Sequence, residues 1–125
     1  MGVVAIAPFR ATVAEIGSRI ALVSLSGELD LYIERELRDA LEAAELVGTP
    51  TVVVDLSGAT FMDSTVCGIL VAEAKRRRQD HGELVLVSNG SRTSRVLMVA
   101  GIDQIVSVHP TLHAAFQELL LEEAH

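Results

Sequence analysis

The chain has 125 residues, half of them apolar and only 3% aromatic, which suits one domain with a core of Val, Leu, Ile and Ala. Its formal net charge of -7 argues against a nucleic-acid binder, because phosphate contacts need a concentrated positive surface. Cys67 is the only cysteine, so no internal disulfide can form and a cytoplasmic location is expected. No secretion signal or membrane-inserted span is recognised in the sequence.

The first predicted elements are two strands joined by a tight turn. Residues 1–8 are interpreted as a loosely held lead. Strand-like runs cover residues 9–16 and 20–26, and the Gly17-Ser18 spacer between them predicts an antiparallel hairpin. Residues 27–30, which read GELD, are expected to form a polar, flexible corner before a helix.

An amphipathic helix is predicted after this corner. Apolar residues recur at three- and four-residue steps from Ile33 to Val47, with charged residues between them. Gly48 and Pro50 follow directly and are typical of a helix end.

The central stretch is predicted to be a buried strand that leads through a loop into a second helix. Residues 52–55 read VVVD, a β-branched run that suits a strand covered on both faces. Gly58 is expected to break the strand, and Phe61 and Met62 to anchor the turn. The helical pattern begins at Ser64 and places Cys67 on the apolar stripe, which favours a buried and inert thiol.

The join between this strand and helix carries Asp63, Ser64 and Thr65. A helix start has backbone N–H groups without partners and a partial positive charge, so Asp63 is a good candidate for the N-cap. At least one of the two hydroxyls is then expected to face solvent. The plain alternative is that all three residues only cap the helix. The basic run at residues 75–78 is interpreted as a solvated helix end.

The remaining elements continue an alternation of strands and helices. A strand is predicted at residues 84–87, a helix capped by Ser91 and ended by Gly101, a strand at 105–108, and a last helix beginning with Pro110. Alternation of this kind predicts parallel strands joined by right-handed crossovers. The predicted fold is therefore α/β: a mixed sheet with an opening antiparallel hairpin, largely parallel strands after it, and four helices.

Sequence motifs of enzymes are missing. The chain has no P-loop, no G-x-G-x-x-G and no G-x-S-x-G. His109 and His113 are four residues apart, yet no further ligand completes a metal set. We therefore expect no catalysis and no metal, and we interpret the Ser64 hydroxyl as a group that another protein modifies.

GELD with its following helix, and then DLSGATFMDST before a second helix, resemble the STAS domain family, and within it the bacterial anti-sigma factor antagonists. The resemblance extends from about residue 9 to residue 121, so residues 1–125 are interpreted as a single STAS domain. It implies a partner-switching protein that binds an anti-sigma factor serine kinase and so releases a sigma factor. Phosphorylation by that kinase switches the antagonist off, and a phosphatase restores it.

By position in the motif, the resemblance implies Ser64 as the phosphoacceptor, with Thr65 as the alternative. ATP and magnesium would belong to the kinase, so no cofactor is expected in this chain. The acceptor and its motif neighbours are the expected partner-binding residues. They are Asp30, Ser57, Gly58, Asp63, Ser64 and Thr65.

Two departures from the family motif follow the acceptor. Val66 and Cys67 stand where the family usually has Gly and Leu, and Val66 is expected to add bulk where a kinase must approach. An alternative therefore stays open, in which the domain is an assembly subunit of a stress-sensing complex or a transporter without a phosphorylation switch. An exposed apolar patch at Phe61 and Met62 would allow a weak homodimer.

Overall fold

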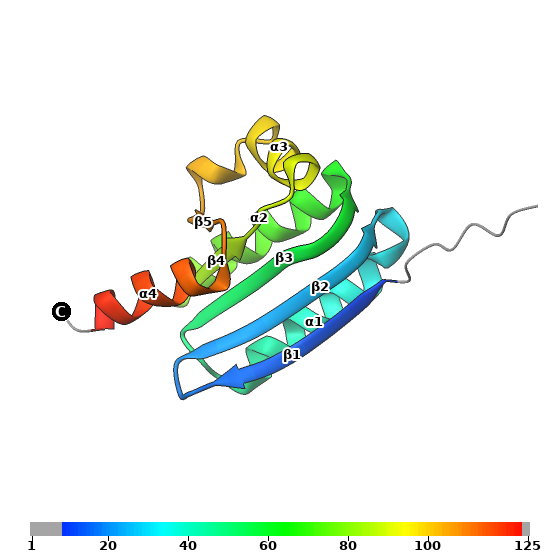
Figure 1. Ribbon diagram of the computed structural model, residues 1–125. Helices are drawn as coiled ribbons and strands as arrows, with labels where there is room; N and C mark the ends of the chain where they lie inside the picture. The colour runs from blue at the N-terminus through cyan, green and yellow to red at the C-terminus, as the bar shows by residue number, and fades with distance from the viewer. Residues whose placement is uncertain (1–8, 124–125) are drawn as a thin grey trace, which may run out of the picture.

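The computed structural model describes residues 9–123, which form one five-stranded sheet in the order β1-β2-β3-β4-β5 (Figure 1). The strands are β1 (Arg10–Ile16), β2 (Ile20–Leu29), β3 (Thr51–Met62), β4 (Glu83–Val87) and β5 (Val108–His109). The helices are α1 (Glu34–Val47), α2 (Ser64–Gln79), α3 (Ser91–Val99) and α4 (Leu112–Glu123), with short 3-10 turns η1 (Leu31–Ile33) and η2 (Ile102–Gln104).

The directions of the strands confirm the predicted mixed sheet. β1 is antiparallel to β2, whereas β2, β3, β4 and β5 are mutually parallel. The hairpin turn takes three residues, Gly17 to Arg19, because Ile16 pairs directly with Ile20. Gly17 opens the turn at φ +61°, a left-handed conformation that glycine adopts without steric cost. The predicted lead at residues 1–8 lies outside the described residues.

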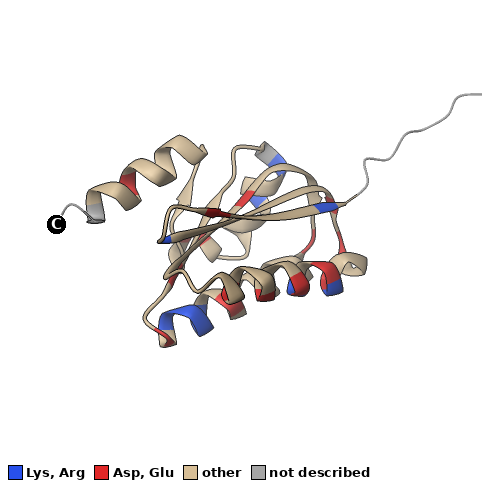
Figure 2. Cartoon of the chain, turned by 90° about the horizontal axis from the view of Figure 1, so that it is seen from below, with Lys and Arg blue, Asp and Glu red and all other residues tan. Residues whose placement is uncertain are grey.

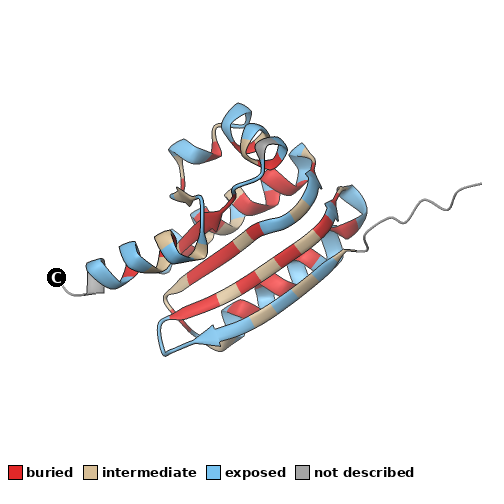
Figure 3. Cartoon of the chain, in the orientation of Figure 1, coloured by how far each residue is buried: buried red, intermediate tan, exposed pale blue. Residues whose placement is uncertain are grey.

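Helices cover both faces of the sheet, but unequally. α1, α2 and α3 pack on one face and enclose the larger core, while α4 packs on the other face beside β4 (Figure 1). Val52 to Val54 of β3 lie between the two layers and are fully buried, as their run of β-branched residues predicts. β1 stays largely exposed at the sheet edge (Figure 3).

Strands β2 and β3 are both longer than predicted. Residues 27–29 continue β2 and do not form a corner, and β3 runs through Gly58 to Met62, so the predicted loop is wrong. Two register shifts between Ser24 and Glu28 each place one extra residue in β3, as in β-bulges. Gly58 is needed there because a Cβ atom would lie 2.7 Å from the Ser26 Cβ. Gly58 therefore marks a close approach of β2 and β3 and does not break β3.

The last third of the chain also differs in detail from the prediction. β5 contains only Val108 and His109, because the preceding residues form η2 and an irregular segment. Gly90 occupies the N-cap position of α3, and Ser91 is its first residue. Pro110 precedes α4, whose first turn is capped by the Thr111 hydroxyl, which accepts from the Ala114 N–H at 3.0 Å.

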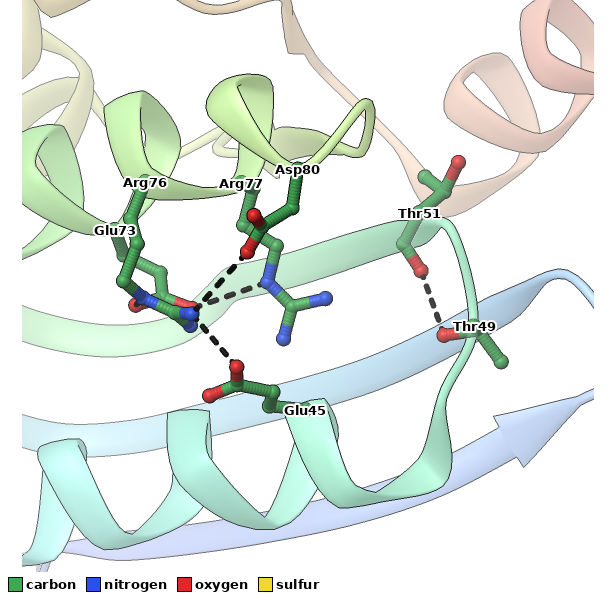
Figure 4. Close-up of polar contacts among 7 residues, drawn as sticks. All are labelled: Glu45, Thr49, Thr51, Glu73, Arg76, Arg77 and Asp80. Atoms are coloured by element: carbon green, nitrogen blue, oxygen red, sulfur yellow. Dashed lines mark hydrogen bonds and ion pairs between the residues drawn. The ribbon is translucent and has the colours of Figure 1, made fainter.

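The basic run at the end of α2 is partly buried, which corrects the predicted solvated helix end. Arg76 donates to Glu73 and to Glu45 of α1, both at 2.7 Å (Figure 4). Those hydrogen bonds, first to Glu73 and then to Glu45, raise the pKa of the Arg76 guanidinium. Arg77 is only 6% exposed, and its Nε donates to Glu73 at 3.0 Å. Acidic residues recur along α1 (Figure 2).

Candidate functional site

The parallel pairing of β2 with β3 brings two acidic residues to the same edge of the sheet. Leu29 pairs with Met62, and the Asp63 N–H donates to the Leu29 carbonyl at 3.1 Å. Asp30 and Asp63 therefore follow neighbouring positions on adjacent strands. This edge holds the carboxyl ends of the parallel strands, where ligand and partner sites of α/β proteins commonly lie.

Local hydrogen bonds hold both carboxylates. Asp63 has extended backbone angles and accepts from the Val66 N–H at 3.2 Å, so it is the N-cap of α2 as predicted. Asp30 accepts from the Tyr32 N–H at 2.9 Å and caps η1. Each carboxylate is half-buried and has a fixed direction, so the two negative charges form a preorganised acidic rim.

The two hydroxyl residues predicted at this join are exposed. Ser64 and Thr65 are the first two residues of α2, and both face solvent beside Asp63. The first N–H groups of a helix lack intrahelical partners and carry partial positive charge. The Ser64 hydroxyl thus combines exposure with backbone donors that favour an added negative charge.

Val66 and Cys67 point in the opposite direction, into the core. Val66 is 0% exposed, so its bulk lies inside the molecule and not on the surface that a kinase would approach. This placement corrects the expected obstruction. Cys67 is buried as predicted, and its burial, followed by the negative charge of Asp63, raises the pKa of the thiol. The thiol therefore stays neutral and inert.

Ser57 and Gly58 lie in β3 and not in a loop beside the acceptor. Both are exposed, and the Ser57 N–H donates to the Asp55 carboxylate at 2.9 Å. Ser57 lies six residues and Gly58 five residues before Asp63 along the strand. At about 3.3 Å per residue, the distance from Asp63 is roughly 15 to 20 Å. The structure thus brings together Asp30, Asp63, Ser64 and Thr65, and leaves the other two predicted residues farther down the strand.

Of the large exposed apolar side chains at this edge, Phe61 was predicted, whereas Leu31 and Tyr32 were missed by the sequence reasoning. Leu31 is 56% exposed and Tyr32 82% exposed, both directly after Asp30, and Phe61 is 44% exposed near the end of β3. Met62 is only 3% exposed, so the predicted Phe61–Met62 patch is wrong for Met62. Tyr32 could have been noticed as the single tyrosine of a chain with few aromatic residues. We call Leu31, Tyr32 and Phe61 the apolar rim.

Within residues 9–123, no group of three His, Cys, Asp or Glu side chains is arranged to hold a metal ion. In the same part of the chain, no helix is long and apolar enough to cross a bilayer. What the site offers is an exposed hydroxyl, two oriented carboxylates and the apolar rim. Such an arrangement suits protein contact, because aromatic anchors and fixed charges supply affinity and specificity.

Comparisons of the sequence and of the structure with known proteins agree with one another. A model of the STAS domain matches residues 11–115. An anti-sigma-B factor antagonist of Listeria monocytogenes is 30% identical over 86 residues, which cover 69% of this chain and 75% of that protein. A crystal structure of an anti-sigma factor antagonist from Mycobacterium paratuberculosis has a TM-score of 0.81 at 28% identity, covering 89% of this chain and 93% of that chain.

A structure of the Bacillus cell fate determinant SpoIIAA in its phosphorylated form has a TM-score of 0.67 and covers 88% of this chain and 99% of that chain. At 18% identity this likeness concerns the fold alone.

Proposed function

The chain belongs to the STAS domain family, and from that premise we propose that it is an anti-sigma factor antagonist controlled by phosphorylation of Ser64. In this proposal the unphosphorylated chain binds an anti-sigma factor that is also a serine kinase, and a sigma factor is released. The observation that carries the proposal is the exposed Ser64 hydroxyl at the start of α2, beside Asp30 and Asp63.

The relatives support this role. The Listeria monocytogenes protein is an anti-sigma-B factor antagonist, and the similar Mycobacterium paratuberculosis chain is an anti-sigma factor antagonist. SpoIIAA, which shares the fold, exists in a phosphorylated form. A regulator of this kind acts by binding, so the proposal needs no catalytic group in this chain. It assigns ATP and magnesium to the kinase and places the chain in the cytoplasm with its partners.

The geometry accounts for how one phosphate could end binding without unfolding the domain. Phosphorylation adds about 1.5 to 2 negative charges at pH 7. The N–H groups in the first turn of α2 can accept that charge, so the helix is kept. The same charge joins Asp30 and Asp63 on one small patch. A partner surface that fitted two carboxylates and the apolar rim then meets strong repulsion.

The test is to incubate the protein with ATP, magnesium and the cognate anti-sigma kinase, followed by intact-mass spectrometry and peptide mapping. We expect one added phosphate, located on Ser64. Ser64→Asp should weaken kinase binding about tenfold or more, whereas Ser64→Ala should bind as tightly as the wild type and gain no phosphate. Thr65→Ala should still gain one phosphate on Ser64. Ser18→Ala, which changes an exposed serine of the β1–β2 turn at the other end of the sheet, is the matched control and should behave as the wild type in both measurements.

Two outcomes would redirect the assignment. Phosphate on Thr65 would move the acceptor by one residue and leave the switch intact. No phosphate with any anti-sigma kinase, together with equal binding of Ser64→Asp and Ser64→Ala, would favour the alternative of an assembly subunit in a stress-sensing complex or a transporter. The apolar rim would then serve permanent assembly.

A further inference from the structure

A second candidate site lies at the opposite end of the sheet from Ser64. It is a half-open cavity of about 480 Å³. Its walls come from the β1–β2 turn, the start of β3, the end of α2, the α2–β4 turn, the segment after η2, and α4. α2 has 16 residues and is therefore about 24 Å long at 1.5 Å per residue. The cavity therefore lies about one helix length from Ser64.

The cavity exists because β5 is short. Val108 and His109 pair with Leu86 and Val87, so β5 covers only the last two residues of β4. The preceding segment consists of η2 and coil, and leaves space between Leu84, Val106 and Leu119 of α4. The Glu83 N–H donates to the Pro50 carbonyl at 2.9 Å and fixes the floor. The walls are thus held by the fold and are already formed.

Basic side chains gather in this lining although the whole chain has a formal net charge of -7. The described lining includes Arg19, Arg78 and His81, with Glu83 of opposite charge. Arg78 reaches from α2 to the segment after η2, where its Nη2 donates to the Ile105 carbonyl at 2.8 Å. That bond uses one of the five N–H donors of a guanidinium and holds the group across the cavity.

The C-terminal end of α2 repels an anion less than a helix end with free carbonyl groups would. The His81 N–H donates to the Arg78 carbonyl at 3.1 Å, and the Gly82 N–H donates to the Arg77 carbonyl at 2.7 Å. This is the hydrogen-bond pattern of a Schellman motif, which satisfies carbonyls of the last helical turn. The negative end of the helix is therefore partly covered by backbone donors.

His81 occupies the left-handed position of this motif, with φ +62°. Glycine is the usual residue there, because it adopts this conformation without the steric cost that a side chain adds. Gly82 cannot exchange places with it, since a Cβ at residue 82 would lie 2.8 Å from the Pro50 carbonyl oxygen. The chain thus keeps an imidazole in the cavity wall at a conformational cost. A residue that departs from the preference for glycine at this position indicates a functional role for its side chain.

We propose that this cavity binds a small organic anion, a carboxylate or a phosphate monoester. Its charged group pairs with Arg78 and His81, and its apolar body contacts the wall formed by Ile20, Val106 and Leu119. Cavities of this size are typical of small-molecule sites, and a guanidinium is the side chain best suited to both anions. The site is independent of the phosphorylation switch.

The first experiment is a titration of 15N-labelled protein followed by amide chemical shifts. The ligands are benzoate and phenyl phosphate, with benzyl alcohol as the uncharged analogue. We expect saturable shifts at Gly82, Leu84 and Ser107, none at Ser64, and binding of benzyl alcohol about tenfold weaker or less. The two anions separate a carboxylate site from a phosphate site. Equal binding of all three ligands, or shifts centred on the start of α2, would overturn the proposal.

Two variants test the named side chains. Arg78→Gln should weaken anion binding about tenfold, while Arg92→Gln, an exposed arginine of α3 outside the lining, should leave it unchanged. His81→Gly should weaken binding about fivefold yet raise the melting temperature by about 2 to 5 °C, because the backbone strain is relieved. Loss of binding in a more stable variant cannot result from unfolding. A stabilised His81→Gly that binds as the wild type would exclude His81 from the site.

Discussion

At the scale of single residues, the first two turns of α2 separate the site from the core. Ser64, Thr65 and Gly68 face solvent, whereas Val66 and Cys67 face the interior. The helical rotation of about 100° per residue produces this division. Val66 therefore belongs to the packing of the core, although the sequence motif places it next to the phosphoacceptor. Because glycine has no side chain, Gly68 leaves the exposed side of the helix uncovered.

Substitutions at Val66 and Gly68 should consequently change stability in opposite directions. Val66→Gly removes a fully buried side chain and adds a flexible residue, so the free energy of unfolding should fall by about 3 to 4 kcal/mol. Gly68→Ala should raise it by about 0.5 to 1 kcal/mol, because a Cβ there meets no atom within 4 Å. Urea denaturation measures both. A Val66→Gly variant as stable as the wild type would show that Val66 is not part of the core.

At the scale of elements, α2 joins two different tasks. Its first residue is capped by Asp63 and carries the proposed acceptor, and its last turns pack Arg77 against the end of α1 (Figure 4). Arg77 has its Nε bonded to Glu73, but its Nη2 is buried and has no hydrogen-bond partner among residues 9–123. The buried guanidinium charge of Arg77 therefore depends on Glu73 for compensation. Its unsatisfied Nη2 donor lowers the stability of the fold.

Removal of either partner should therefore have unequal effects. Glu73→Gln leaves the Arg77 charge buried and poorly compensated, and should lower the free energy of unfolding by about 3 kcal/mol. Arg77→Met removes both the charge and the unsatisfied donor, and should change it by less than about 1 kcal/mol. Thermal and urea unfolding compare the two. Glu42→Gln, an exposed acid of α1, is the control. An Arg77→Met variant as unstable as Glu73→Gln would mean that the guanidinium itself stabilises the fold.

At the scale of the whole molecule, the sheet carries two surfaces at opposite ends. The carboxyl edge holds Ser64, Asp30, Asp63 and the apolar rim, and the amino edge holds the basic cavity. Between them, β3 and β4 are covered on both faces, whereas β1 forms an exposed edge (Figure 3). A stable centre with functional surfaces at its ends lets one end be modified while the fold persists.

Hydrogen exchange should reveal this gradient of stability. Amides of Val52 to Val54 and of Val85 to Val87 should exchange most slowly, through global unfolding, because both faces of their strands are buried and neighbouring segments pair with them. Amides of β1 should exchange at least about tenfold faster through local opening at the sheet edge. The rates are measured by NMR in deuterated buffer. Equal protection of β1 and β3 would show that β1 is not a loosely covered edge strand.

The amino-acid sequence by itself determined the order of strands and helices, the N-cap at Asp63 and the burial of Cys67, because hydrophobic periodicity and helix-end chemistry act over a few residues. The relation to the STAS domain family rested on equally local motifs.

Only the tertiary structure decided that β3 runs through Gly58, since a β-bulge depends on the neighbouring strand. It also decided that Met62 is buried, and that the basic side chain of Arg77 lies in the interior. These features depend on which segments meet in space, and that information is spread over the whole chain.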